Sequence, residues 1–145
     1  MRRPCLFVHA DMMGAYMNDL IISQGGVSPS CFPPNKPIYS GHFRKSHLVT
    51  RKDVSIDYIG SPHETSFAEA RQAKSLVVLD ASQDWKMIER ISLDSGRKHY
   101  CATSVEDLLA LDRVKKGDRV VVIMAKDDFE QERRQAEPGS VSTID

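Results

Sequence analysis

The chain has 145 residues, of which 41% are hydrophobic, and its 20 basic side chains equal its 20 acidic ones. This composition is typical of a globular protein, and the balanced charge favours neither a nucleic acid nor an anionic membrane as partner. No apolar run reaches the roughly 18 residues of a membrane-spanning helix. The three cysteines are widely spaced and form no CxxC pair, which argues against a zinc knuckle or a disulfide framework. A reducing, cytoplasmic location is therefore expected.

The first third of the chain predicts one strand, one helix and an irregular insertion. Residues 5–9 are typical of a buried strand, and Asp11 is positioned to cap a helix that ends at Gly25-Gly26. Residues 27–52 lose this periodicity, because prolines interrupt their first part and basic and aromatic residues fill their second. An insertion of this length in a compact domain is usually functional or disordered.

The middle of the chain predicts two more strand–helix pairs. Residues 53–59 alternate apolar and polar side chains, which predicts a half-buried or edge strand. Ser61-Pro62-His63-Glu64 forms a capping box for a helix that runs to about residue 73. The apolar run 74–80 predicts a strand buried on both faces, and apolar residues at helical spacing predict a helix that ends at Gly96.

The last third predicts a similar alternation. A weak strand over 99–102 precedes a second capping box at 103–106, which opens an amphipathic helix. Residues 119–124 predict a strongly apolar strand, and 129–134 predict an exposed charged helix. The tail 138–145 is expected to be frayed.

Strands that alternate with helices five times predict an α/β fold. We expect a single three-layer domain over residues 1–137, with a five-stranded, mostly parallel sheet of Rossmann-like or flavodoxin-like type. Loops that follow parallel strands meet at one edge of the sheet, where ligands bind. The polar side chains expected at that edge are His9, Asp11, Asp80, Thr103 and Asp127.

Two aspartates at this edge predict a metal site. Asp11 and Asp80 would follow neighbouring strands, and hard divalent cations such as Mg or Mn prefer carboxylate oxygens. His9 is expected to act as an accessory ligand or proton carrier, so His9, Asp11 and Asp80 are the candidate catalytic residues. The ordinary alternative is that Asp11 caps a helix and that His9 is satisfied locally.

Predicted helix N-termini offer anion contacts at the same edge. Ser82, Thr103 and Ser104 follow short loops, where free N–H groups and the helix dipole favour negative charge. No glycine-rich dinucleotide motif or P-loop is present, and every α/β domain has such termini. These residues are therefore general ligand-binding candidates.

The basic and aromatic stretch 39–52 predicts a phosphate-binding arm. Arg44 and Lys45 would close over a phosphorylated ligand or nucleotide. The same stretch is compatible with RNA binding, since arginine and aromatic side chains serve stacking and backbone neutralisation. A solvated loop is the ordinary alternative.

The first strand and its following loop carry a family resemblance. Phe7-Val8-His9-Ala10-Asp11-Met12-Met13-Gly14 resembles the first motif of DHH-type phosphoesterases, a strand followed by His-x-Asp-x-Asp-Gly and a helix. The strand end Leu79-Asp80 is similar to a later metal-binding strand of that family. Met13 replaces the second Asp of the motif, and Cys101-Ala102-Thr103 replaces the Asp-His-His. The resemblance implies a metal-dependent phosphoesterase fold with a depleted metal site that retains His9, Asp11 and Asp80.

The sequence thus predicts a domain that binds a phosphorylated ligand or nucleotide, with metal-dependent phosphoester hydrolysis as its catalytic form. One alternative is a non-catalytic protein-interaction or regulatory module, which would use residues 28–50 and the charged terminal helix. A second alternative is RNA binding through the 39–52 arm.

Overall fold

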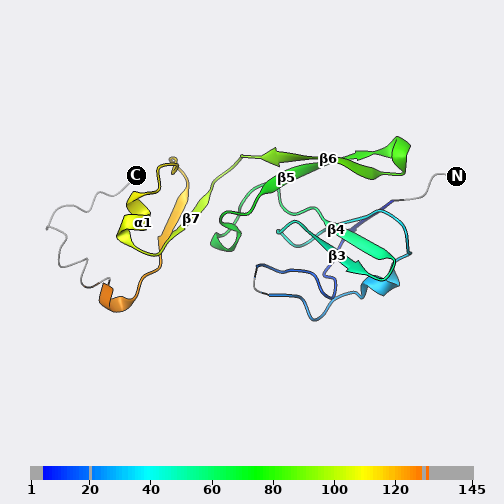
Figure 1. The fold of residues 1–145 in the computed structure, drawn as a ribbon, viewed down its shortest axis with the longest axis horizontal. Coiled ribbons are helices and arrows are strands. Elements are labelled where there is room, and N and C mark those ends of the chain that lie inside the picture. The colour runs from blue at the N-terminus through cyan, green and yellow to red at the C-terminus, as the bar shows by residue number, and fades with distance from the viewer. Residues whose placement is uncertain (1–4, 20, 129, 131–145) are drawn as a thin grey trace. The chain divides into compact units, whose positions relative to one another are not determined.

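The computed structural model describes residues 5–19, 21–128 and 130. The chain divides into two compact units, Met1–His99 (unit 1) and Tyr100–Asp145 (unit 2), and each is described by itself. Strands make up most of the regular structure, and the helical segments are short (Figure 1).

A four-stranded sheet lies at the centre of unit 1. Its order is β1 (Leu6–His9), β2 (Ile38–Gly41), β4 (Val54–Tyr58) and β3 (His47–Arg51). β1, β2 and β4 are parallel, whereas β3 pairs with β4 in the antiparallel sense. The predicted strands over 5–9 and 53–59 are confirmed in position. β1 is not buried as predicted, because Phe7 and His9 are exposed, and β4 lies inside the sheet and not at its edge.

One face of this sheet carries the hydrophobic core. Ile38, Ile56 and Tyr58 point to this face and are almost completely buried, together with Met12 from the loop after β1. The Tyr58 hydroxyl donates a hydrogen bond of 2.8 Å to the carbonyl oxygen of Ala10. Alternate residues of a strand point to opposite faces, so Phe7, His9, Tyr39 and Asp57 lie on the other face.

A β-hairpin lies against this second face. β5 (Lys74–Asp80) pairs antiparallel with β6 (Lys86–Leu93), and the short helix η3 (Ala81–Gln83) lies in their connection. The Tyr39 hydroxyl donates to the carbonyl oxygen of Trp85 at 2.8 Å, and Arg90 forms an ion pair with Asp57 at 3.1 Å. These contacts join the hairpin to β2 and β4.

The predicted α/β fold is wrong. There is no helix-flanked, five-stranded, mostly parallel sheet of Rossmann-like or flavodoxin-like type in the described residues, but several small sheets with antiparallel or mixed pairing. Residues 27–52, predicted to be irregular, contain β2, β3 and the short helix η1 (Pro29–Cys31). The structure divides near residue 99, whereas the sequence predicts one domain over 1–137.

Three predicted helices are replaced by other structures for local reasons. The segment after Asp11 is a loop that the bridges Met12–Val27 and Tyr16–Ile22 close. Residues 61–73 form only the short helix η2 (Phe67–Glu69), because the Glu64 carboxylate bonds to the distant backbone N–H of His99 and does not cap a helix. After Asp80 the chain turns through left-handed Asp84 and Trp85 and returns as β6, whose isoleucines suit a strand.

Unit 2 contains a small two-stranded sheet and one helix. β7 (His99–Ala102) pairs with β8 (Arg119–Val122), which confirms both predicted strands. α1 (Val105–Leu109) begins one residue later than its predicted capping box, because Ser104 Oγ accepts the N–H of Asp107 at 3.0 Å. Residues 126–128 are helical, but most of the predicted helix 129–134 and the tail 138–145 lie outside the described residues. In the described part, no helix is long and apolar enough to cross a membrane.

Candidate functional site

A groove of about 480 Å³ lies in unit 1 along the second face of the sheet. Its volume is within the range of small-molecule sites, roughly 300–1,000 Å³. Phe7, Tyr39 and Leu76 give it a largely apolar and aromatic lining, while His9 and Ser75 supply polar groups. The groove is therefore the candidate ligand site of unit 1.

The parallel register of β1 and β2 builds one wall of the groove. Phe7 lies opposite Tyr39, and the two rings stack with centroids 5.9 Å apart. Trp85 from the hairpin turn meets the edge of Phe7 at 6.3 Å. Aromatic faces arranged in this way suit a flat ligand, which can stack on them.

His9 lies at the end of this wall. Its register partner is Gly41, and a Cβ at Gly41 would lie only 2.7 Å from His9 Nδ1, so glycine leaves the room that the imidazole occupies. The His42 ring meets His9 edge to face at 5.5 Å, and its backbone has a left-handed φ of 84°. Because His9 is exposed, its ring nitrogens are accessible to a ligand.

A polar hollow of about 340 Å³ adjoins the groove. Lys45, Lys74 and Arg90 line it, and Ser75 lines both the hollow and the groove. The Arg90 guanidinium donates to Ser75 Oγ at 3.1 Å and also pairs with Asp57. Burial raises the pKa of Asp57, while the charge of Arg90 opposes this shift. Cationic side chains thus lie next to the aromatic groove.

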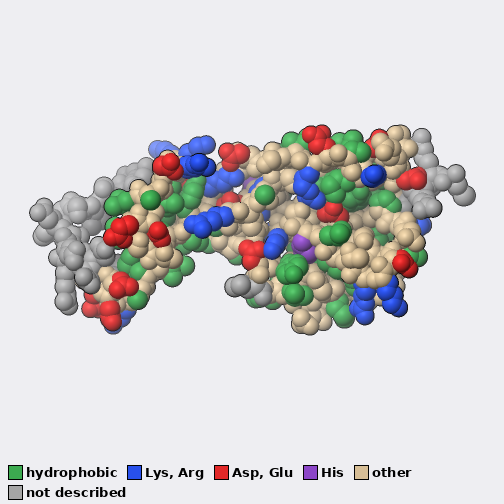
Figure 2. All heavy atoms as spheres, in the orientation of Figure 1, with side chains coloured by type: hydrophobic (Ala, Val, Ile, Leu, Met, Phe, Trp, Pro, Cys, Tyr) green, Lys and Arg blue, Asp and Glu red, His purple; other side chains and the backbone are tan. Residues whose placement is uncertain are grey.

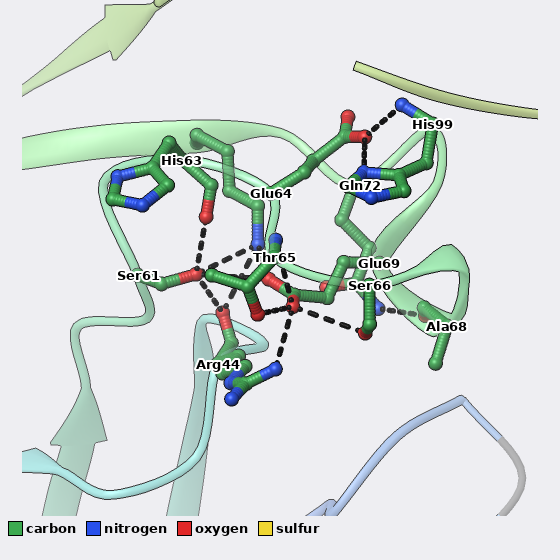
Figure 3. A network of polar contacts seen from close by, with 11 residues as sticks. Arg44, Ser61, His63, Glu64, Thr65, Ser66, Ala68, Glu69, Gln72 and His99 are labelled. Carbon is green, nitrogen blue, oxygen red and sulfur yellow. Dashed lines mark hydrogen bonds and ion pairs between the residues drawn. The ribbon is translucent and has the colours of Figure 1, made fainter. Parts of the chain in front are cut away.

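A buried carboxylate fixes the segment that follows β4 (Figure 3). Glu69 accepts hydrogen bonds from Lys74 at 2.6 Å, from Ser61 at 3.0 Å and from Thr65, and it pairs with Arg44 at 3.1 Å. Only 4% of the Glu69 side chain and 1% of the Lys74 side chain are exposed. Burial alone would raise the pKa of Glu69, but the bonds from Lys74 and Thr65 outweigh it and hold the pKa at about 2.

A second buried pair holds the same segment at another point. The Glu64 carboxylate accepts the backbone N–H of His99 at 2.7 Å and lies 3.3 Å from its Nδ1, as Figure 3 shows. The Phe67 ring packs edge to face on His99 at 5.0 Å. With Glu69, this pair keeps residues 61–73 ordered without a long helix, and Gly60 and Pro62 beside it line the groove.

The predicted metal residues have local roles. Asp80 Oδ1 accepts the N–H and hydroxyl of Ser82 at 2.7 and 2.6 Å, and its Oδ2 accepts from Gln83. The bonds from Ser82 and Gln83 lower the pKa of Asp80. Asp11 Oδ1 is buried without a hydrogen-bond partner among the described residues. The described part of the chain contains no group of three or more His, Cys, Asp or Glu that could hold a metal, so Mg or Mn binding stays a prediction.

The remaining predicted site residues are distributed over both units. Lys45 lines the polar hollow, and Arg44 belongs to the Glu69 network. Thr103 and Ser104 lie in unit 2, where Thr103 bonds to Asp107 and Ser104 caps α1. His9 and Lys45 therefore lie in the candidate site, and Ser82, Thr103 and Ser104 have local structural partners.

The sequence interpretation missed most of the groove. No motif marks Ser75 or Arg90, and the motifs that include Phe7, Tyr39 and Leu76 do not indicate a shared groove. The alternation in 6–9 places Phe7 and His9 on one face, but only the parallel pairing with β2 adds Tyr39 to that face. The alternation of residues 6–9 is therefore the one sequence feature that indicates part of the groove.

Comparison with known proteins assigns no family, because no family model and no curated protein sequence matches the chain. The resemblance of residues 7–14 to DHH-type phosphoesterases stays a prediction. Function is inferred from the side chains of the groove and the hollow.

Proposed function

We propose that unit 1 binds a small ligand of the nucleotide class, which combines a flat apolar group with an anionic group. The observation that supports this proposal is that Ser75 lines both an aromatic groove and a hollow that Lys45, Lys74 and Arg90 also line. The flat group stacks in the groove next to Phe7 and Tyr39, and the anionic group lies toward Arg90. His9 supplies a hydrogen-bond or proton-transfer partner in the groove.

The donors that line the hollow support an anionic ligand. Its lining includes three cations, Lys45, Lys74 and Arg90, and no carboxylate of the described residues. Each of these cations has a carboxylate partner beside the hollow, Asp19, Glu69 and Asp57 respectively, so the charge around it is balanced. The side chains of Lys45 and Arg90 are partly exposed, and an anionic group can accept charge-assisted hydrogen bonds from them.

We propose that unit 1 binds this ligand and does not hydrolyse it. The carboxylate of Asp80 is committed to Ser82 and Gln83, so the pair of Asp11 and Asp80 is a poor starting point for metal-dependent phosphoester cleavage. A cytoplasmic location belongs to the proposal, since all three cysteines are free and a reducing compartment keeps thiols so.

Titration with nucleoside mono- and diphosphates tests the proposal. The single tryptophan of the chain, Trp85, contacts Phe7 and should report ligand binding through its fluorescence. We expect saturable changes with at least one nucleotide. Leu76→Asp places a carboxylate in the groove and should weaken binding by about 10-fold or more, which is about 1.4 kcal/mol.

Leu109→Asp is the control. Leu109 is also an exposed leucine, but it lies in α1 of unit 2 and does not line the groove. This variant should bind as the natural chain does. Absence of saturable binding for every nucleotide, or equal weakening in both variants, would contradict the proposal.

A further inference from the structure

Both ring nitrogens of His47 have a backbone partner. The N–H of Tyr16 donates to His47 Nε2 at 2.9 Å, and His47 Nδ1 lies 2.9 Å from the carbonyl oxygen of Lys45. A carbonyl oxygen can only accept, so Nδ1 carries the proton, and Nε2 must keep its lone pair for Tyr16. The geometry therefore requires the neutral imidazole with the proton on Nδ1.

The bond to Nε2 attaches a loop to the sheet. Tyr16 belongs to the loop after β1, where it forms a bridge with Ile22. Its ring meets the His47 ring at 5.4 Å, and Lys45 Nζ lies 5.0 Å above it. Lys45 also forms an ion pair with Asp19 of the same loop. His47 at the start of β3 is thus a central attachment point of this loop.

We propose that His47 is a proton-operated latch that holds this loop on β3. A proton from solvent adds to the Nε2 lone pair, and the imidazolium then presents N–H groups at both nitrogens. Two N–H groups, those of Tyr16 and Nε2, then face each other, and the hydrogen bond is lost. Tyr16 separates from β3 while the sheet itself stays folded, because no ladder bond of the sheet depends on this imidazole.

The surroundings of His47 set the direction of its response. Burial lowers the pKa of His47, and the nearby charge of Lys45 lowers it further. The hydrogen bond to the Lys45 carbonyl and the charge of Asp57 on β4 raise this pKa, but by less. The neutral rings of Tyr58 and Phe43 pack against the imidazole at 4.7 and 6.4 Å. The pKa of His47 is therefore lower in the folded protein than the ordinary value of about 6.5. Above about pH 6.5 the neutral imidazole stabilises the fold. This stabilisation is lost as the pH falls through the pKa of the folded protein.

Amide hydrogen exchange of the full chain tests the latch. Between about pH 7.5 and about pH 5, the protection of the Tyr16 amide, corrected for its intrinsic exchange rate, should fall by about 10-fold or more. The amide of Ile56 in β4 should keep its protection, because it reports opening of the sheet. Unchanged protection at Tyr16, or an equal fall at Ile56, would overturn the proposal.

Two variants separate His47 from the other histidines. His47→Gln keeps an acceptor oxygen but does not titrate, so the protection of Tyr16 should become independent of pH. His42→Gln changes an exposed neighbour and should leave the pH response intact. Nitrogen chemical shifts of the His47 ring in the natural chain give a readout that needs no variant. A proton on Nε2 near neutral pH, or a pH response that persists in His47→Gln, would overturn the proposal.

Discussion

Glu69 is the residue on which the order of the segment after β4 depends most. Its two carboxylate oxygens accept bonds from Lys74, Ser61 and Thr65 and an ion pair from Arg44, although the residue is almost completely buried. A buried ion is tolerated when it is paired and fully hydrogen-bonded. Without Lys74, the only cation that still pairs with the buried carboxylate is Arg44, whose side chain is more than half exposed, so the cost of removing Lys74 should be large.

Lys74→Met tests this dependence, since it keeps the length of the side chain and removes the charge. We expect the free energy of unfolding near neutral pH to fall by about 3–5 kcal/mol. The pKa of Glu69 is about 2 in the fold and about 4.5 in an unfolded chain, so the ionised pair stabilises above about pH 4.5. This stabilisation is lost as the pH falls toward about 2, and the difference between variant and natural chain should shrink over that range.

Urea unfolding at several pH values measures both effects. Lys86→Met is the control, because Lys86 is an exposed lysine in the same hairpin, and its replacement should change stability by no more than about 0.5 kcal/mol. A small cost for Lys74→Met, or a cost that does not depend on pH, would show that Arg44 and the hydroxyl partners are sufficient to stabilise Glu69 and would contradict this dependence.

At the scale of elements, most strands could be predicted from the sequence, whereas β2, β3 and β6 and most helices could not. Apolar runs and alternation located β1, β4, β5, β7 and β8, because the period-two pattern reports one buried face directly. Apolar residues at helical spacing around Trp85 and Ile88 predict a helix, and this prediction is wrong. The backbone makes a left-handed turn at Trp85 instead, and Ile88 lies in the second strand of a hairpin. The capping box with Glu64 also predicts a helix that does not form, because Glu64 bonds to His99, which is 35 residues away in the sequence.

The loop after β1 closes on a glycine. Gly26 has a φ of +80°, and a Cβ there would lie against the carbonyl group of Asp11 and 2.8 Å from its Cγ. Gly26→Ala should therefore lower the free energy of unfolding by about 2 kcal/mol or more, through backbone strain and the clash. Thermal unfolding of the variant measures this loss.

Gly25→Ala is the adjacent control. No atom lies within 4 Å of a Cβ at Gly25, and its backbone is not left-handed. We expect a change in stability within about 0.5 kcal/mol. Equal losses in both variants would mean that the Asp11 contact does not shape the loop.

The candidate site could be predicted only in part, because its residues meet through long-range contacts. His9 and Lys45 carry polar groups whose chemistry marks them in the sequence, and they line the groove and the hollow. Phe7 and Tyr39 lie in two separate stretches of the sequence and become one site only through the register of β1 and β2. These paired residues are 32 positions apart, and register over that separation depends on long-range packing, which a local pattern does not encode.

At the scale of the whole molecule, charge gives little guidance to function. Basic and acidic side chains are interspersed on the face that Figure 2 draws. The proposed site depends instead on the partly exposed donors of Lys45 and Arg90 beside the groove. All residues of the main core cluster and of the groove belong to unit 1. We therefore assign the proposed ligand binding to unit 1.

Mapping a bound nucleotide on the full chain by amide chemical shifts is the most direct test of ligand binding in the groove. We expect saturable shifts at the amides of His9, Gly41, Ser75 and Leu76, which line the groove on three strands. Residues of β8 in unit 2 should not shift. Shifts confined to unit 2, or no saturable shift in the groove for any nucleotide, would contradict it.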